Sequence, residues 1–283
     1  MCDEFTLADD LARLSRREFA VGGAVALAAT SGVASAAAGK PVKEEMVMVT
    51  TPDGTADCFF VRPAKGKHPG VILWPDIGGL RDAFKTMARR LAADGFAVLA
   101  VNHYYRAGKA PLLASFAEWR TPAGQEKLKP AIASVNAATT ASDAKAFVAW
   151  LDKNPSVDTR RKIGNQGYCQ TGGWTIRAAA ASPRIGAAAS FHGGGLVNDK
   201  PDSPHKVLAA TNARYLIAIA KNDDARAPGD KDALKAAAAE GKRSAEIEVY
   251  AGDHGWTVPD SSSYNQAEGD RAHARLLALY SKL

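Results

Sequence analysis

Short apolar runs alternate with longer amphipathic stretches along the chain from about residue 44 onward. Eight of the short runs have the length and the β-branched or aromatic content of strands. These runs cover residues 46–50, 58–62, 70–74, 96–101, 163–168, 185–191, 215–220 and 246–250. Five longer stretches show a helical pattern, and they cover residues 83–93, 141–151, 173–181, 230–240 and 267–281.

This alternation predicts an α/β fold, a doubly wound, mostly parallel sheet with helices on both faces. The continuous apolar run 70–74 is typical of a strand buried on both faces. The first two strands flank the turn Pro52-Asp53-Gly54 and should pair antiparallel. Residues 105–135 carry little periodicity, so we expect a loop or short helices there, near the mouth of a site. Ligands of such sheets bind beyond the carboxyl ends of the strands.

The beginning of the chain follows a different pattern. Arg16-Arg17 precede an apolar run at 19–29, and Ala34-Ser35-Ala36 has the form of a cleavage site. This order resembles a bacterial twin-arginine signal, which exports folded proteins. The run is too short for a membrane-spanning helix, which needs about 20 residues. We expect residues 1–36 to be removed and residues 37–283 to form a single domain. The mature protein should then be periplasmic or secreted, without membrane contact.

Composition and charge narrow the function classes. Hydrophobic residues make up 46% and charged residues 23% of the chain, the ordinary balance of a soluble globular protein. The net charge of +6 is scattered along the chain without a Lys/Arg-rich run, which argues against nucleic acid as a partner. The sequence shows no metal-ligand spacing and no G-x-G-x-x-G fingerprint, so we expect neither a metal nor another cofactor.

The three cysteines differ in their surroundings. Cys2 falls within the expected signal. Cys58 lies in an apolar, strand-like run, where a buried structural thiol is expected. Cys169 is then the candidate for chemistry, and a disulfide between Cys58 and Cys169 is the alternative in an oxidising compartment.

The segment Gly167-Tyr168-Cys169-Gln170-Thr171-Gly172-Gly173 joins a predicted strand to a predicted helix. A nucleophile elbow has this order of strand, sharp turn and helix, with small residues around the nucleophile. The start of a helix also favours the thiolate over the thiol. We therefore interpret Cys169 as a nucleophile. Thr171 departs from the pattern, because it stands where the elbow has a second small residue.

Of the six histidines, His254 is the candidate base. It follows the last predicted strand in a glycine-flanked loop, which gives the α/β-hydrolase chain order of nucleophile, acid and histidine. His103 ends a strand and is expected at most to line the site. His192-Gly193-Gly194-Gly195 looks like an oxyanion loop but follows the nucleophile instead of preceding it, so we interpret it as a turn.

The acid that orients His254 should follow the strand predicted at 215–220. Asp223 and Asp224 both do. Counting from the strand favours Asp223, whereas counting back from Pro228 favours Asp224. We favour Asp223 and keep Asp224 open.

Together, Gly167-Tyr168-Cys169, Asp223 or Asp224, and His254-Gly255-Trp256 resemble the Cys-His-Asp triad of dienelactone hydrolases (carboxymethylenebutenolidases). The resemblance covers about residues 44–282 and implies an α/β-hydrolase fold. It implies that the backbone N–H groups of Ile77 and Gln170 form the oxyanion hole.

Two further segments resemble that family, Trp74-Pro75-Asp76-Ile77-Gly78-Gly79 and Tyr104-Tyr105-Arg106. The resemblance implies that Asp76 stands where an acidic residue contacts the resting cysteine and that Arg106 grips a substrate carboxylate. It places Tyr105 and Trp256 beside the substrate as well. Asp76 is one methylene shorter than the family's usual Glu, and Val258 stands near the position of a second arginine.

The expected activity is hydrolysis of a carboxylic ester or lactone through a thioester acyl-enzyme on Cys169. The substrate should be a small molecule, and Arg106 predicts a preference for an anionic one. Two alternatives remain at this point. One is a carboxylesterase or thioesterase with another substrate range, and the other is a catalytically silent binding protein of the same fold.

Overall fold

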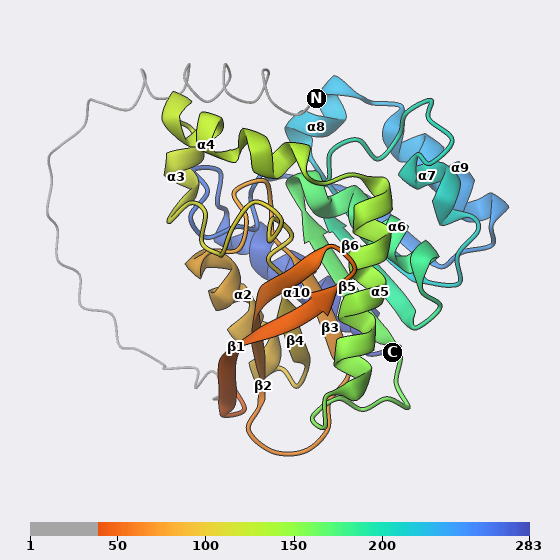
Figure 1. Ribbon diagram of the computed structural model, residues 1–283. Helices are drawn as coiled ribbons and strands as arrows, with labels where there is room; N and C mark the ends of the chain where they lie inside the picture. Colours follow the sequence, from red (N-terminus) through yellow and green to blue (C-terminus); the bar gives the residue numbers. More distant parts are fainter. Residues whose placement is uncertain (1–38) are drawn as a thin grey trace, which may run out of the picture. The chain divides into compact units, whose positions relative to one another are not determined.

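A computed structural model describes residues 39–283 of the chain (Figure 1). The twin-arginine signal expected at 1–36 lies outside the described residues. Residues Lys40–Leu283 form one compact unit. Within residues 39–283, no helix combines the length and the apolar composition that a membrane crossing requires.

Eight strands form one sheet in the order β1-β2-β4-β3-β5-β6-β7-β8. Its strands are β1 (Val42–Thr51), β2 (Gly54–Pro63), β3 (Gly70–Trp74), β4 (Ala97–Ala100), β5 (Ile163–Tyr168), β6 (Ile185–Phe191), β7 (Arg214–Ala220) and β8 (Ala245–Tyr250). β1 pairs antiparallel with β2, and β2 with β4. The other neighbours are parallel. All eight predicted strands are present, and the doubly wound fold is confirmed.

Helices cover both faces of this sheet (Figure 1). The longer helices are α2 (Asp82–Ala93), α4 (Pro122–Ala133), α5 (Ala137–Lys153), α6 (Gly172–Ala181), α9 (Asp230–Glu240) and α10 (Gln266–Tyr280). Phe84 of α2 and Leu276 of α10 belong to the core on one face. Phe147 of α5, Trp174 of α6 and Leu234 of α9 belong to the core on the other. Because β3 lies between these two layers, all of its residues are buried, as its continuous apolar run predicted.

Helix α5 begins at Ala137 instead of the predicted residue 141, because a cap at Asn136 extends the helix. The Asn136 side chain accepts the N–H groups of Ala138 and Thr139 at 2.9 and 3.1 Å, and the Thr139 hydroxyl accepts the Asn136 N–H at 2.8 Å. This capping box satisfies N–H groups that the first helical turn leaves unpaired. The turn that it adds has no apolar spacing, and for this reason the sequence pattern missed it.

The region 105–135 holds one short helix, as expected, namely α3 (Phe116–Trp119), but it also contains all of α4, which is longer than expected. Two further short helices had no signal in the sequence pattern, α7 (Pro204–Leu208) and α8 (Lys221–Arg226). α8 directly follows β7 and contains both candidate acids.

Candidate active site

Strand β5 runs into a strained turn at Cys169, at the carboxyl end of the sheet. Cys169 has a φ of 54°, a left-handed conformation that costs free energy for a residue with a Cβ and is typical of a nucleophile elbow. The Thr171 hydroxyl braces the turn, because it accepts the Tyr168 N–H at 2.9 Å and donates to the Trp74 carbonyl at 3.0 Å. The turn at Cys169 therefore lies where the ends of β3 and β5 meet the start of α6.

The departure from the elbow pattern at Thr171 has a structural explanation. The close backbone approach occurs one residue later, at Gly172, where an added Cβ would lie 2.5 Å from the Cα of Gly193. The loop after β6 thus packs directly against the start of α6. Since Gly172 is the residue that must be small, Thr171 fits the turn and contributes its hydroxyl.

His254 and Asp223 form a hydrogen-bonded pair beside this turn. The Nδ1 atom of His254 lies 2.7 Å from the Asp223 carboxylate, and the His254 N–H donates to the Asn222 side chain at 2.8 Å. Asp224 points elsewhere and binds the Lys231 ammonium at 2.8 Å. Of the two candidate acids, the structure brings only Asp223 to His254.

Two opposing effects set the charge of His254. Burial alone would lower its pKa, but the negative charge of Cys169, the hydrogen bonds to Asp223 and Cys169 and the charge of Asp223 outweigh burial and raise the pKa to about 10. Opposite charges at short range in a buried site favour the charged form of each partner. The arrangement favours an imidazolium at His254, between the Cys169 sulfur and the Asp223 carboxylate.

His192 is a site residue that the sequence interpretation missed. Its Nδ1 atom accepts the Cys169 N–H at 3.2 Å, and its Nε2 atom lies 2.9 Å from the Thr257 hydroxyl. In the same loop, the Gly194 N–H donates to the Cys169 carbonyl at 3.1 Å. The segment 192–195 is therefore a brace of the elbow. Strand adjacency is the signal that could have identified it, because Phe191 at the end of β6 is in register with Tyr168 at the end of β5.

The two expected oxyanion donors follow neighbouring strands, Ile77 after β3 and Gln170 after β5. Ile77 lies in the turn after β3, which the Gly79 N–H closes by donating to the Asp76 carbonyl at 3.0 Å. Within residues 39–283, the Ile77 N–H has no acceptor. Gln170 follows Cys169 directly, and its side-chain oxygen accepts the Tyr104 hydroxyl at 2.8 Å. The loop that follows β4 thus holds the Gln170 side chain, while the backbone of Gln170 is part of the elbow.

The model of the dienelactone hydrolase family matches residues 56–283, a span that contains the elbow, both candidate acids and His254. The chain belongs to the dienelactone hydrolase family. Its enzyme class is that of the carboxylic ester hydrolases, of the carboxymethylenebutenolidase-like kind.

Individual relatives agree with the family match. A Synechocystis sp. protein with a provisional carboxymethylenebutenolidase name is 28% identical over 244 residues, which cover 84% of this chain and 96% of that protein. A Klebsiella pneumoniae structure with a provisional dienelactone hydrolase name has a TM-score of 0.74 at 21% identity, over 86% of this chain and 100% of that chain. A dienelactone hydrolase-like promiscuous phosphotriesterase from metagenomic libraries has a TM-score of 0.70 at 22% identity, over 86% and 98% of the two chains. These structures share the fold.

Asp76, expected beside the resting cysteine by resemblance to dienelactone hydrolases, is held elsewhere. Both of its carboxylate oxygens accept hydrogen bonds from Arg81, at 2.6 and 2.9 Å. Arg81 is fully buried and also donates to Asp260 at 2.7 and 2.8 Å. This corrects the expectation for Asp76. Its carboxylate fixes the Ile77 turn to the loop that follows His254, because the buried arginine requires counter-charges.

Arg106, expected to grip a substrate carboxylate in this family, lies between two carboxylates of the protein itself. It donates to Asp143 at 2.8 Å through both terminal nitrogens and to Asp53 at 2.6 Å. Tyr105 joins the same network, with its hydroxyl donating to Asp143 at 2.9 Å and accepting from Thr51 at 2.6 Å. The structure therefore assigns Arg106 and Tyr105 to an internal network instead of an open binding surface.

Trp256, also expected beside the substrate, has no exposed surface. Its ring stacks on Tyr250 with centroids 5.3 Å apart and meets His192 edge-on at 5.1 Å. Trp256 is a core residue that packs against His192, which corrects the expectation that it lies beside the substrate.

Cys58 and Cys169 are both free and buried, so the alternative of a disulfide between them is wrong. Burial raises the pKa of the Cys58 thiol, which keeps this cysteine protonated. His103 is buried against Tyr104 and Trp174, and burial lowers its pKa to about 3. Within residues 39–283, no three His, Cys, Asp or Glu side chains gather in a way that could hold a metal ion.

Proposed function

We propose that this member of the dienelactone hydrolase family cleaves small carboxylic esters or lactones through a thioester on Cys169, with His254 as base and Asp223 as the acid that orients it. One observation carries the proposal. Cys169 stands at a positive φ at the end of β5, hydrogen-bonded to a histidine ring whose other nitrogen lies 2.7 Å from the Asp223 carboxylate.

The reaction begins with attack of the Cys169 thiolate on the substrate carbonyl carbon, which forms a C–S bond and an oxyanion. When the oxyanion collapses, the C–O bond to the alcohol breaks, and the His254 imidazolium gives its proton to the leaving oxygen. His254, now neutral, takes a proton from water, and the resulting hydroxide attacks the thioester. A carboxylic acid is released and the thiolate–imidazolium pair is restored.

The N–H groups of Ile77 and Gln170 are proposed to stabilise the oxyanion. The support is that the Ile77 N–H has no acceptor within residues 39–283 and that Gln170 follows the nucleophile in an elbow. One donor of this kind typically lowers a barrier by about 3–4 kcal/mol. Asp76 and Arg81 would keep the Ile77 donor in place through their buried ion pair.

We propose that neutral or weakly charged esters and lactones are better substrates than dianionic ones. Arg106 is already paired with two carboxylates, Asp53 and Asp143, so a third carboxylate would meet a local excess of negative charge. The Asp53→Asn variant should raise the ratio of kcat/KM for an anionic ester over its neutral analogue about three- to tenfold. Asp158→Asn is the matched control. Asp158 forms its ion pair with the exposed Arg160 and takes no part in the network of Arg106.

The first experiment compares hydrolysis of a dienelactone and of 4-nitrophenyl acetate by the full chain and by its Cys169→Ala variant. We expect turnover by the full chain and a loss of about 10⁴-fold or more in the variant. Mass spectrometry after a short reaction should find the acetyl group on Cys169. Turnover that survives Cys169→Ala would refute the nucleophile. An unreactive Cys169 with no turnover on any ester would favour the silent binding protein.

We also propose that residues 1–36 export the protein to the periplasm, on the strength of Arg16-Arg17, the apolar run at 19–29 and the Ala34-Ser35-Ala36 site. Replacing both arginines by lysine should retain the protein in the cytoplasmic fraction of a bacterial host. Export of the lysine variant at the original level would contradict a twin-arginine signal.

A further inference from the structure

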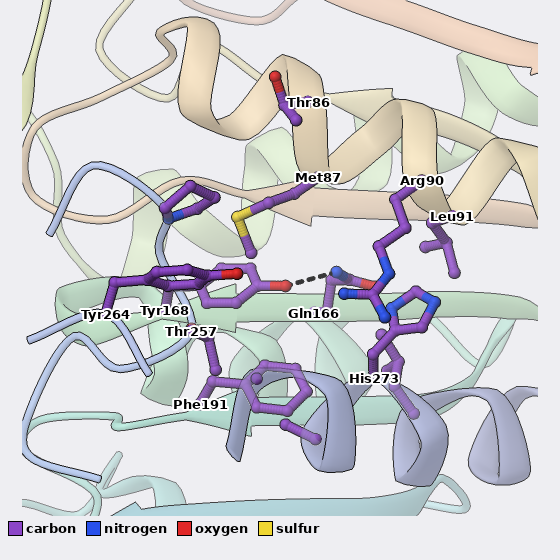
Figure 2. A pocket seen from close by; sticks show the side chains of 14 residues that line it. Thr86, Met87, Arg90, Leu91, Gln166, Tyr168, Phe191, Thr257, Tyr264 and His273 are labelled. Atoms are coloured by element: carbon purple, nitrogen blue, oxygen red, sulfur yellow. Dashed lines mark hydrogen bonds between the residues drawn. The ribbon is translucent and has the colours of Figure 1, made fainter. Parts of the chain in front are cut away.

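A separate cavity of about 240 Å³ lies on the α2 and α10 face of the sheet, behind the elbow (Figure 2). Strands β5 and β6 form its floor, and α2 and α10 form its walls. Met87, Leu91, Phe191 and Leu276 give it an apolar lining. None of the proposed triad residues lines it.

One end of this cavity is polar, and it carries hydrogen-bond donors that have no acceptor within residues 39–283. In Figure 2, Gln166, Arg90 and the Tyr168 hydroxyl gather at this end. The Tyr168 hydroxyl accepts the Gln166 amide N–H at 2.7 Å, and the Gln166 oxygen accepts the Tyr280 hydroxyl at 3.1 Å. The Tyr168 hydroxyl hydrogen is left without an acceptor within residues 39–283. Tyr168 is only 3% exposed, and a buried donor without an acceptor is costly.

Arg90 adds further donors to the same end. One of its terminal nitrogens lies 2.8 Å from Asp270, and its other N–H groups have no partner in the described part of the chain. Burial raises the pKa of Tyr168, so its phenol stays protonated and remains a donor. A ligand that completes this end must therefore supply a hydrogen-bond acceptor. Because Asp270 already balances Arg90, that acceptor does not need to carry a charge.

The size and walls of the cavity define the rest of the ligand. A closed apolar cavity of about 150 Å³ admits benzene, whereas pockets for drug-sized ligands measure about 300–1,000 Å³. The volume of about 240 Å³ therefore suits one ring with a short head group. Tyr168 and Phe191 present stacked aromatic rings with centroids 5.2 Å apart, and Tyr264 stands at the cavity with 41% of its surface exposed.

We propose that this cavity is a second small-molecule site, which binds a single-ring aromatic compound with a carbonyl or carboxylate oxygen facing Tyr168 and Arg90. It is distinct from the ester-cleaving site, and it does not depend on the identity of the nucleophile. Thr257 lines the cavity and also contacts His192, so this site shares a wall with the brace of the elbow.

The test titrates benzamide and benzoate into the full chain and measures binding by ligand-observed NMR and calorimetry. For a ligand of this size we expect a Kd on the order of 1 mM. Gly269 offers a matched pair of variants, because it lines the cavity and an added Cβ would have its nearest neighbour at 3.8 Å. Gly269→Leu should fill the cavity and weaken binding about tenfold or more, whereas Gly269→Ala should stay within about threefold.

Arg90→Gln gives a second test that does not depend on filling the cavity, with Arg89→Gln as its control on the same helix, where Arg89 pairs with Glu44. Loss of the Arg90 donors should weaken benzamide binding about fivefold, and Arg89→Gln should leave it unchanged. Benzylamine, a cationic donor of the same size, should not bind measurably. Alkylation of Cys169 with iodoacetamide should leave benzamide binding within about twofold.

Three results would overturn the proposal. The first is no benzamide or benzoate binding up to about 20 mM. The second is binding that Gly269→Leu and Arg90→Gln both leave unchanged. The third is binding that disappears when Cys169 is alkylated, because it would place the ligand in the ester-cleaving site.

Discussion

His192 and His254 lie with their ring centroids 4.9 Å apart, and both sit against the same cysteine. Their pKa values nevertheless move in opposite directions. That of His254 is raised to about 10 in spite of burial, and burial holds that of His192 well below its ordinary range. The charge on His254 lowers the pKa of His192 further.

The difference lies in what the ring nitrogens face. His254 meets two groups that carry negative charge, the Asp223 carboxylate and the Cys169 sulfur. His192 meets a backbone N–H donor and the Thr257 hydroxyl. A buried imidazole is charged only where anions compensate for desolvation. His254 can therefore hold and move a proton, whereas a neutral His192 can hold the elbow without repelling its neighbour.

Among substitutions around the two histidines, the largest expected effect comes from removing the carboxylate that pairs with His254. Asp223→Asn keeps the shape of the side chain but removes the charge and favours the wrong tautomer of His254. We expect kcat for an ester to fall about 10³- to 10⁴-fold, as such a change does in serine-protease triads. Steady-state kinetics at pH 7 with 4-nitrophenyl acetate would measure it.

Asp224→Asn is the control for this prediction, because the Asp224 carboxylate binds Lys231 instead of a histidine. Its kcat should stay within about twofold of the parent, since partly exposed ion pairs contribute little. If the two variants lost activity equally, Asp223 would have no special part in the site.

The sequence predicted that Asp223 and Asp224 both follow β7, but it did not determine which of them pairs with His254. Both follow β7, and the choice depends on how the first turn of α8 directs each side chain, which is set by packing and not by residue type. Most strands were predictable, because a short apolar or alternating run identifies them by period and length, whereas β5, with Asn165 and Gln166 at its centre, was recognised by its place before the elbow.

Arg106 illustrates a different limit of the sequence. The family resemblance identified Arg106, but its partner Asp143 lies on α5, far along the chain. Asp143 is buried on a helix face that also carries Ala144 and Phe147, and a carboxylate on such a face indicates a buried cation opposite it. The position of Asp143 on an apolar helix face was visible in the sequence, but the sequence did not specify which arginine pairs with it. His192 could be placed beside Cys169 only after β5 and β6 were known to be neighbouring strands.

A smaller effect is expected from replacing the neutral histidine. His192→Leu leaves the Cys169 N–H without its acceptor, and we expect kcat to fall about tenfold with KM unchanged. His192→Asn places an amide oxygen near the former Nδ1 position and should retain kcat within about threefold. Both variants should lose similar stability in urea unfolding, so recovery of kcat in the Asn variant would separate positioning from folding. Equal losses in the two variants would contradict the role of the hydrogen bond.

The two histidines should also give stability opposite slopes with pH. The raised pKa of His254 means that its contribution to the free energy of unfolding is complete below about pH 6.5 and is lost as the pH rises toward 10. The lowered pKa of His192 means that its contribution is complete above about pH 6.5 and is lost as the pH falls below that value.

Urea unfolding of His254→Gln and His192→Asn between about pH 5 and pH 10 would measure both slopes. The deficit of His254→Gln relative to the parent should shrink by about 1.4 kcal/mol or more between pH 6 and pH 10, which corresponds to one or more pKa units. The deficit of His192→Asn should instead be smaller at pH 5 than at pH 8. Parallel slopes would remove the contrast between the two rings.

The smallest effect on kcat is expected from replacing Thr257, which contacts the Nε2 atom of His192. Thr257→Val keeps the shape of the side chain but removes the hydroxyl 2.9 Å from Nε2, which frees the ring to adopt either tautomer. Only the tautomer with the proton on Nε2 can accept the Cys169 N–H, so a mixture of tautomers would weaken the brace. We expect kcat to fall about threefold, less than for His192→Leu, because the ring itself remains in place. The double variant Thr257→Val/His192→Leu should lose no more activity than His192→Leu alone, since Thr257 acts through that ring. An additional threefold loss in the double variant would show that Thr257 reaches the elbow by another route.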